Sequence, residues 1–357
     1  MNSKHENIEN KVKLSKIAID MHLKSFRVVR QQDHSMVQPA QRFEPARFYQ
    51  WLEKEKTRAE RVVVCYEAGC FGYEPARRME AMGVEVKVIA PQNWDEQGKR
   101  QVNDKSDASV MCRRLSEYLD GHSKALSVVH IPSREEEADR AQGRFRDQLC
   151  RELRRMGAMG RSLLSQRERW VRGRWWRGKM WGEVTQGMPL WVVHKLEIWK
   201  ELIEKLEKLI AQEEKQLRVA AETAEPILFG EGTLTHVLLK RELLNKHRFK
   251  NARQLGNYFG LCPSESTSGE RRRLGSITKH GNPRLRHMMV ELAWRIVRFQ
   301  PEYVALRRWG PVLQDKSSSA PARKKAIVAV ARRLAIDLWR IAIGRKTAQE
   351  LGLRLSE

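Results

Sequence analysis

The sequence predicts an α/β region followed by a region that is almost entirely helical. Apolar and polar residues alternate over residues 14–32 on both sides of a short turn, which predicts two antiparallel strands. A β-branched run within residues 61–69 predicts a buried central strand. After about residue 133, helical spacing and basic residues replace these patterns, which marks the start of the helical region.

The remaining elements of the α/β region follow from spacing and from residues that end helices and strands. Residues 44–60 carry helical spacing, and residues 74–83 predict a short helix closed by its final glycine. Residues 84–91 predict another strand, which its final proline ends. Strand, helix and strand with short connections are typical of an α/β layer, and we expect this layer to occupy residues 14–145.

The helical part divides into two regions. Residues 146–225 form a basic segment whose last part, 194–220, predicts a long helix with apolar residues three and four positions apart, as in a coiled coil. Its other face mixes Glu with Lys, which favours a partner helix over a nucleic-acid surface. Residues 226–345 predict a helical domain interrupted by a polar, glycine-containing loop at 264–282. The expected coiled-coil stripe consists of Leu196, Trp199, Ile203, Leu206, Ile210 and Leu217.

Composition limits the classes of function. The chain has 357 residues and a formal net charge of +24, so we expect a polyanionic partner, and a ribosomal or merely soluble basic protein is the plain alternative. Five cysteines form no CxxC pair and no Cys/His set with zinc-finger spacing, which argues against structural zinc and fits a reducing compartment. The sequence has no apolar targeting segment or membrane-length run, so we expect a cytoplasmic protein without a membrane partner.

Four carboxylates are placed where they can converge. Asp20 ends the first expected strand and Glu67 ends the central one, while Asp104 and Asp107 are three residues apart and would share one face of a helix. Such a set can hold two divalent cations for phosphoryl transfer, and hard oxygen ligands favour Mg²⁺, with Mn²⁺ as the substitute. Taken singly, each acid could instead cap a turn, pair with an arginine or solvate a helix face.

A second candidate site is the polar segment 264–287, where hydroxyls stand next to a glycine and a group of cations. A serine beside a glycine in a tight loop can expose its hydroxyl as a nucleophile, and guanidinium groups can hold a phosphodiester. The alternative is a loop that only grips the DNA backbone, in which His280 contacts phosphate rather than acting as a general base. The cations are Arg271, Arg272, Arg273, Lys279, Arg284 and Arg286.

Basic and aromatic residues are interleaved in segment 169–181. From Arg140 to Met180 there are 13 Arg or Lys against 3 acids. Stacking on unpaired bases together with phosphate contacts would suit RNA or single strands, whereas tryptophans packed inside the helical hairpin of an oligomer are the alternative. The residues expected to contact nucleic acid are Arg169, Arg172, Arg174, Trp175 and Arg177.

The order of these motifs resembles the DEDD transposases of bacterial insertion sequences, a family that includes bridge-RNA-guided serine recombinases. The resemblance covers about 14–170, which holds the four acids, and about 248–294, which holds the serine segment. It implies an RNase H-like N-terminal domain of the Holliday-junction-resolvase type, in which the four acids bind Mg²⁺. It also implies a coiled-coil linker and a helical C-terminal transposase domain.

The resemblance further implies the chemistry and the partners. The family's Ser-Gly pair falls on Ser268 and Gly269, so Ser268 is the expected nucleophile, and Ser266 is the alternative within the same hydroxyl cluster. The expected partners are donor and target DNA duplexes, a guide noncoding RNA, and further copies of the chain in a dimer or tetramer, in the nucleoid of a bacterium. Two other readings stay open: a structure-selective, metal-dependent nuclease that uses the acids alone, and a non-catalytic, domesticated transposase that only binds nucleic acid.

Overall fold

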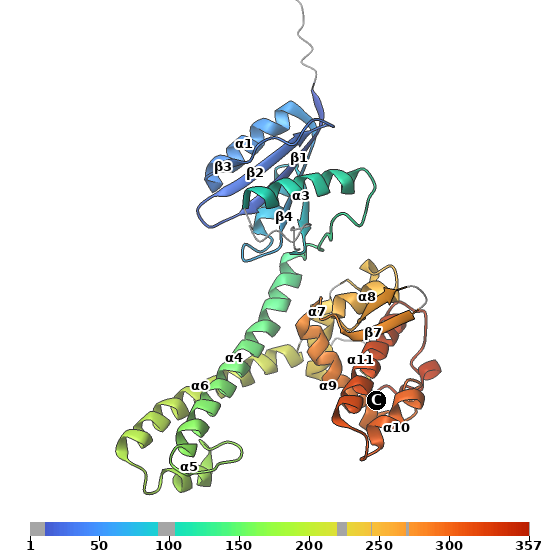
Figure 1. Ribbon diagram of the computed structural model, residues 1–357. Coiled ribbons are helices and arrows are strands. Elements are labelled where there is room, and N and C mark those ends of the chain that lie inside the picture. Colours follow the sequence, from blue (N-terminus) through green and yellow to red (C-terminus); the bar gives the residue numbers. More distant parts are fainter. Residues whose placement is uncertain (1–10, 92–103, 220–226, 244, 269–270, 357) are drawn as a thin grey trace, which may run out of the picture. The chain divides into compact units, whose positions relative to one another are not determined.

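The chain separates into two compact units, Met1–Ser133 and Arg134–Glu357. Figure 1 shows strands and helices together in the first unit, and mostly helices in the second. The expected succession of an α/β region and a helical region is therefore confirmed at this level. The computed structural model describes residues 11–91, 104–219, 227–243, 245–268 and 271–356.

The first unit is built around a five-stranded mixed sheet with the strand order β3-β2-β1-β4-β5. Neighbours among the first three strands are antiparallel, whereas β4 lies parallel to β1 and β5 lies parallel to β4. The carboxyl ends of β1, β4 and β5 therefore meet at one edge of the sheet. The strands are β1 Val12–Met21, β2 Phe26–Gln32, β3 Gln41–Phe43, β4 Ala59–Glu67 and β5 Glu85–Ile89.

Helices cover both faces of this sheet, and alternate residues of β1 show which helix lies on which face. Ile17 and Ile19 pack in one core with Phe48 of α1. Ala18, between them, packs in the other core with Met111 of α3. This alternation follows from the pleat of a strand, in which successive side chains point to opposite faces. The helices are α1 Pro45–Arg58, α2 Glu74–Ala81 and α3 Asp104–Leu119.

The four longer strands and the first two helices confirm the elements expected between residues 14 and 91. The three-residue strand β3 was not expected, because it is too short to carry an alternating pattern. Gly83 follows α2 with a φ of 81°, which lets the chain turn into β5 at little steric cost.

Two long helices, α4 and α6, lie side by side in the second unit (Figure 1). Their shared core includes Leu164, Trp175, Trp176, Leu196 and Ile203. The apolar stripe expected at 194–220 thus packs against α4 of the same chain. For the described residues, the structure gives no contact between this stripe and a second copy of the chain. The helices of this hairpin are α4 Arg134–Ser165, α5 Gly178–Thr185 and α6 Leu190–Val219.

The rest of the second unit is a helical core that carries one β-hairpin. Met289, Leu292, Val330 and Leu334 lie near the centre of that core. The loop expected at 264–282 is wrong in its local structure, since β6 and β7 pair antiparallel there. Backbone pairing rather than a buried apolar face defines these strands, so the polar sequence gives no strand pattern. The elements are α7 Thr233–Leu243, α8 Ala252–Phe259, β6 Pro263–Ser268, β7 Arg271–Ile277, α9 Pro283–Phe299, α10 Leu306–Gln314 and α11 Ala320–Ala342.

The division between the two units falls at the first residue of α4. The domain boundary expected at residue 145 lies inside this helix, whose acidic first turns precede the basic stretch that the sequence pattern marks. The boundary expected at residue 225 lies outside the described residues. Among the described helices, none combines the length and the apolar character needed to cross a membrane.

Candidate functional site

Two of the four expected acids lie at the same end of adjacent parallel strands. Ile19 of β1 is paired with Tyr66 of β4, so Asp20 and Glu67 each occupy the next position along their strands. Neighbours in register on parallel strands point to the same face of the sheet. Both carboxylates are half-buried. The fold therefore brings this pair together, as the sequence predicts.

Helix α3 covers the face to which these two acids belong. Ala18 and Cys65, two positions before Asp20 and Glu67, pack in the core that α3 completes. The Lys16 ammonium of β1 donates a hydrogen bond to Ser116 Oγ of α3 at 2.7 Å, which fixes the helix on the strand.

The other two acids belong to the first turn of this helix. Asp107 is half-buried beside the fully buried Ala108. Asp104 begins α3, but its side chain lies outside the described part of the structure. The topology thus assigns all four acids to one face of the sheet and to the helix that covers it.

The environment of Asp20 adds a residue that the sequence reasoning missed. His22 Nε2 lies 3.0 Å from Asp20 Oδ2, and the side chain of Asp20 is only 25% exposed. Its position two residues after Asp20 was the available signal. Carboxylate oxygens are the donors that Mg²⁺ prefers, so the chemistry of Asp20, Glu67 and Asp107 fits this cation. Within the described side chains, however, no three His, Cys, Asp or Glu residues are grouped closely enough to hold a metal ion.

The thiols beside this site are packing groups. Burial raises the pKa of the Cys65 thiol and raises that of Cys112 to about 12. Both therefore stay protonated at neutral pH, and a protonated, buried thiol is a poor nucleophile. The two thiols are therefore not candidates for a reactive group on this face.

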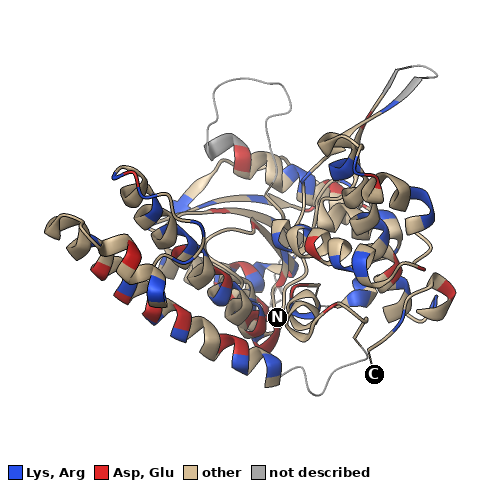
Figure 2. Ribbon diagram, turned by 90° about the horizontal axis from the view of Figure 1, so that it is seen from below, with Lys and Arg blue, Asp and Glu red and all other residues tan. Residues whose placement is uncertain are grey.

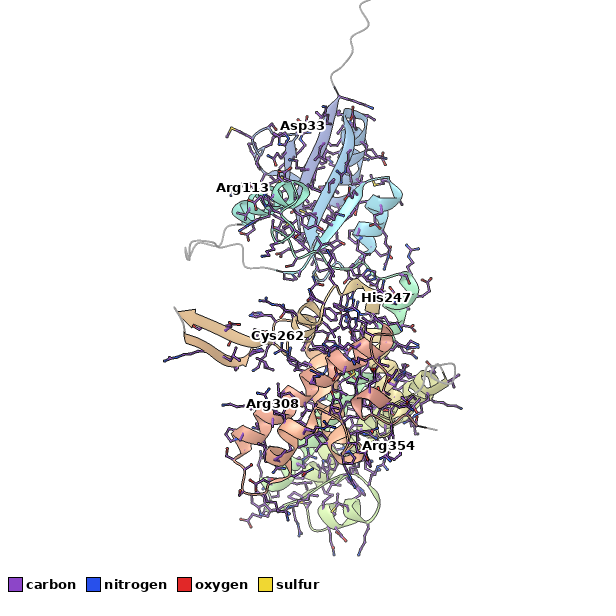
Figure 3. All side chains as sticks on the ribbon, turned by 90° about the vertical axis from the view of Figure 1, so that its right-hand side faces the viewer. Asp33, Arg113, His247, Cys262, Arg308 and Arg354 are labelled. Carbon is purple, nitrogen blue, oxygen red and sulfur yellow. The ribbon has the colours of Figure 1, made fainter. Side chains whose placement is uncertain are left out.

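The candidate nucleophile lies on the β6–β7 hairpin of the second unit. At the base of the hairpin, the Thr278 amide donates to the Cys262 carbonyl at 2.8 Å, and Figure 3 shows the hairpin extending from the helical core there. Ser266 is paired with Arg273 and Ser268 with Arg271, so Ser268 is the last residue of β6. Ser266 is exposed, whereas the Ser268 side chain lies outside the described part.

The cations expected to bind phosphate around this hairpin fall into three groups. Arg273 and Lys279 are exposed, as a phosphate contact requires. The side chains of Arg271 and Arg272 lie outside the described part. Arg284 and Arg286 form the third group, which is bound inside the protein. Arg284 is 14% exposed and its guanidinium pairs with Asp147, so it is not free to hold a phosphate. Arg286 is half-buried and donates to the carbonyls of Phe259 and Lys279.

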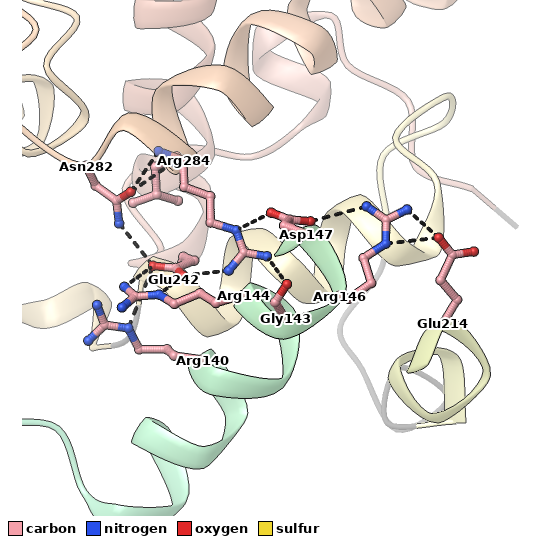
Figure 4. A network of polar contacts seen from close by, with 10 residues as sticks. Arg140, Gly143, Arg144, Arg146, Asp147, Glu214, Glu242, Asn282 and Arg284 are labelled. Carbon is pink, nitrogen blue, oxygen red and sulfur yellow. Dashed lines mark hydrogen bonds and ion pairs between the residues drawn. The ribbon is translucent and has the colours of Figure 1, made fainter. Parts of the chain in front are cut away.

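Arg284 belongs to a cluster of charges centred on Glu242 of α7, shown in Figure 4. Glu242 is 1% exposed and accepts two hydrogen bonds from Arg144, at 2.8 and 3.1 Å. It also accepts from Arg284 Nη1 at 2.8 Å and from Asn282 Nδ2 at 3.0 Å, and Arg140 lies 3.7 Å away. We call Glu242, Arg140, Arg144, Asn282 and Arg284 the Glu242 cluster.

The Glu242 cluster joins three elements that are distant in the sequence. Arg140 and Arg144 come from α4, Glu242 from α7, and Asn282 accepts from the first amides of α9. Arg284 reaches back to α4 as well, pairing with Asp147 at 2.8 Å and donating to the Gly143 carbonyl at 2.7 Å. These contacts hold the start of α9 on α4. Sequence reasoning missed Glu242 because a single acid in a helical pattern carries no signal of its partners.

The surrounding cations also set the titration of Glu242. Burial opposes its ionisation, but hydrogen bonds and charge from Arg144, Asn282 and Arg284 outweigh burial and lower the pKa of its carboxyl to about 2. Glu242 is therefore ionised at neutral pH, and it compensates the arginines around it.

Most of the tryptophan and arginine side chains expected to bind nucleic acid in segment 169–181 instead make contacts within the protein. Trp175 is fully buried and its Nε1–H donates to the Gly157 carbonyl at 2.9 Å, so its ring is not presented to a nucleic-acid base. A Cβ at Gly160 would lie 2.1 Å from the Trp175 ring, so only glycine allows this approach. Packing within a helical hairpin thus accounts for Trp175, and the hairpin belongs to a single chain.

The arginines of that segment differ in their surroundings. Arg177 pairs with Glu207 of α6 at 2.8 Å, and Arg174 lies 3.9 Å from the same carboxylate. Arg169 donates to the Gln186 carbonyl at 3.2 Å. All of these side chains, together with Arg172, are nevertheless exposed. Arg172 is thus the member of this set best placed to meet a phosphate.

Comparison with known proteins decides the family. The family described as "Transposase IS116/IS110/IS902 family" matches residues 228–307. A putative transposase (y4rJ) of Sinorhizobium fredii is 30% identical over 324 residues, which are 83% of this chain and 81% of that protein. The chain belongs to the IS116/IS110/IS902 transposase family. A transposase for the insertion sequence element IS1328 of Yersinia enterocolitica is 27% identical over 78% of this chain and 82% of that protein. A probable family 20 transposase of Pseudomonas aeruginosa is 26% identical over 81% and 86%.

Membership of the IS116/IS110/IS902 family gives the chain its general activity. It is a transposase of an insertion sequence, and transposases act on DNA, so the polyanion expected from the net charge is DNA. The matched residues 228–307 include Glu242, the β6–β7 hairpin and Arg284. The part of the chain that the family model matches thus contains both candidate serines and three members of the Glu242 cluster, Glu242, Asn282 and Arg284.

Proposed function

We propose that this transposase is an RNA-guided DNA recombinase that uses an acidic site in its first unit and a serine in its second. The observation that carries the proposal is the placement of Asp20 and Glu67 at the carboxyl ends of adjacent parallel strands. The strand order β3-β2-β1-β4-β5, with one antiparallel half and one parallel half, agrees with the RNase H-like fold that the resemblance implies. The D-x-x-D pair Asp104 and Asp107 lies in the first turn of the helix that covers the same face.

The acidic site would act on phosphate oxygens. Asp20, Glu67, Asp104 and Asp107 would bind Mg²⁺, which when bound neutralises charge on the attacking and leaving oxygens of a phosphoryl transfer. His22 holds one oxygen of Asp20, which orients the carboxylate. Half-burial of Asp20 and Glu67 limits the competing hydrogen bonds from water.

The covalent step would belong to Ser268. Its Oγ attacks the phosphorus of a phosphodiester, the bond from phosphorus to the 3′ oxygen breaks, and the serine is left joined to the 5′ phosphate. The hydroxyl proton leaves Oγ, and the departing 3′ oxygen takes up a proton to become a 3′ hydroxyl. Attack of a second strand's 3′ hydroxyl on the phosphoserine reverses these changes and restores the serine. Ser266, exposed on the same strand, is the alternative nucleophile.

The partners follow from the same proposal. A bridge RNA would pair with donor and target DNA, so the protein contacts backbone and shape rather than base sequence. The exposed Arg172 and Arg273 suit such backbone contacts. Because two duplexes are cut and rejoined, several active sites are needed, and we propose a dimer or tetramer as the working form.

The test is a recombination assay with the purified protein, its flanking noncoding RNA and matched DNA, in Mg²⁺. We expect Ser268→Ala to lose both the covalent protein–DNA adduct and the recombined product, and Ser123→Ala, at an exposed position away from both proposed sites, to retain them as a control. Asp20→Ala and addition of EDTA should each stop the reaction as well.

Two outcomes would contradict the proposal. If Ser268→Ala still cuts DNA while Asp20→Ala does not, the protein is a metal-dependent nuclease and the serine has only a binding role. If the wild type is fully active in EDTA, the acidic site does not depend on a metal ion.

A further inference from the structure

A groove of about 790 Å³ lies between strand β7 and helix α11 in the second unit. One wall is formed by Leu274, Gly275, Ser276 and Ile277 of β7, and the opposite wall by one face of α11. Trp309 of α10 also lines it. We call this the α11 groove.

The lining of the α11 groove combines cations with an apolar floor. Lys324, Lys325, Arg332 and Arg333 line it, and none of the described residues that line it is acidic. On the same face of α11, Val328 lies between the two lysines and the two arginines, and Ile336 follows the arginines. Spacings of three and four residues bring these side chains onto one face of the helix.

Three of the four cations are not paired with an acidic side chain in the described part of the chain. Arg333 is paired, because its Nε lies 2.7 Å from Oδ2 of the fully buried Asp337, a carboxylate that Arg340 also contacts at 3.1 Å. Within the described part of the chain, Lys324, Lys325 and Arg332 make no ion pair. Lys324 and Lys325 are exposed and Arg332 is half-buried. The groove therefore presents three uncompensated positive charges. Figure 2 shows Lys and Arg spread over many of the helices, so colour by residue type alone does not single out this place.

The position of the groove relates it to the hairpin serines. Leu274, in the groove wall, is paired with Glu265, and the next pair along the hairpin is Arg273 with Ser266. The cations of α11 thus lie across the groove from Leu274, which is the residue next to the exposed Arg273 in β7. The groove thus reaches the position next to the pair formed by Arg273 and Ser266, although the Arg273 side chain points to the opposite face of β7 from Leu274.

We infer that the α11 groove binds the backbone of the DNA strand on which the hairpin acts. Lys324, Lys325 and Arg332 would neutralise successive phosphates, while Val328 and Ile336 contact the sugars. The absence of acids from the lining and the surplus of three charges select a polyanion. DNA is favoured over the guide RNA because the groove wall is the strand that pairs with the serine-bearing one. In that respect the inference rests on the proposed recombinase function.

The experiment measures binding of a fluorescein-labelled DNA duplex to the full chain by anisotropy over a range of salt concentrations. Ser268→Ala is the background, so that covalent capture cannot contribute. We expect the triple variant Lys324→Gln/Lys325→Gln/Arg332→Gln to bind DNA at least about tenfold more weakly near 0.1 M salt, and its salt slope to fall by about 2 to 3. The matched control, Lys205→Gln/Lys208→Gln/Lys215→Gln, removes the same charge from exposed positions of α6 and should change neither quantity by as much.

Several results would overturn the inference. DNA binding by the triple variant equal to that of the α6 control would exclude the groove as a DNA site. An equal or greater loss for a labelled RNA hairpin would assign the groove to RNA. The double variant Lys324→Gln/Lys325→Gln, which keeps the half-buried Arg332, should show most of the effect; binding unchanged in the double variant would attribute the loss to a structural effect of Arg332. Failure of the serine mechanism would appear separately, as an adduct that persists in Ser268→Ala.

Discussion

The Glu242 cluster and the α11 groove are both rich in cations, yet they use them in opposite ways. In the cluster, Arg144 and Arg284 are bound to a carboxylate that is 1% exposed. In the groove, Lys324 and Lys325 are exposed, and no acid is found among the described lining residues. The difference shows that a basic composition does not locate a binding surface by itself. Cations that are already compensated stabilise the fold, and only those left uncompensated can recruit a polyanion.

The largest expected effect is on stability, through Glu242→Ala. Removing this carboxylate leaves arginines without compensation in a partly buried place, which costs about 3–5 kcal/mol. Urea unfolding would measure the loss. Glu350→Gln, which changes an exposed carboxylate paired with Lys346, should leave the unfolding midpoint nearly unchanged. Equal midpoints for both variants would show that the Glu242 cluster contributes nothing to stability.

An effect of similar size is expected from Trp175→Ala, which extends the comparison to the aromatic residues. Trp175 is fully buried, so the substitution opens a cavity and costs about 3–5 kcal/mol. Trp170 is 80% exposed, and Trp170→Ala should change stability little. Thermal unfolding of both variants is the measurement. If Trp175→Ala lowers RNA affinity without lowering the melting temperature, the stacking role expected from the sequence is restored.

A smaller effect should follow acidification. The pKa of Glu242 is lowered from 4.5 to about 2 in the folded chain, so its ionised form stabilises the fold fully above about pH 4.5. This contribution is lost as the pH falls from about 4.5 toward about 2. We expect the free energy of unfolding to fall more steeply over this window in the wild type than in Glu242→Gln. Parallel curves for the two proteins would contradict the shift.

The smallest expected effect separates two arginines that look alike in the sequence. Arg273 is exposed, so Arg273→Ala should weaken DNA binding and reduce the salt slope by about 1, without changing stability. Arg284 makes charged hydrogen bonds inside the protein, so Arg284→Ala should cost about 1.5–3 kcal/mol of stability. DNA-binding anisotropy and urea unfolding should be measured for both variants. A loss of stability in Arg273→Ala, with unchanged stability in Arg284→Ala, would contradict these roles.

Sequence periodicity predicts the sheet unit well because its strands bury one or both faces. Strands β1, β2, β4 and β5 show this pattern, and it also places Asp20 and Glu67 at strand ends. Strand β3 and the β6–β7 hairpin escape prediction, since short or polar strands are defined by backbone pairing with a partner elsewhere in the chain.

The sequence also does not identify which residues or helices contact one another across long separations in the chain. The stripe at 194–220 correctly predicts a partner helix, but periodicity does not say whether that helix belongs to the same chain. The role of Arg284 depends on Glu242, which is 42 residues away. The local sequence pattern gives no sign of such a contact, so it predicts phosphate binding for Arg284.

The close approach of Trp175 and Trp176 to α4 has a consequence for the order in which the chain acquires structure. Gly157 and Gly160 make room for the two rings, and each glycine weakens an isolated helix by about 1 kcal/mol relative to alanine. The second half of α4 is therefore a poor helix until these rings dock on it. During synthesis, residues 150–165 leave the ribosome before the two tryptophans do. That half of α4 becomes stable only when the later segment has emerged and folded back, so the hairpin forms as one cooperative unit rather than helix by helix.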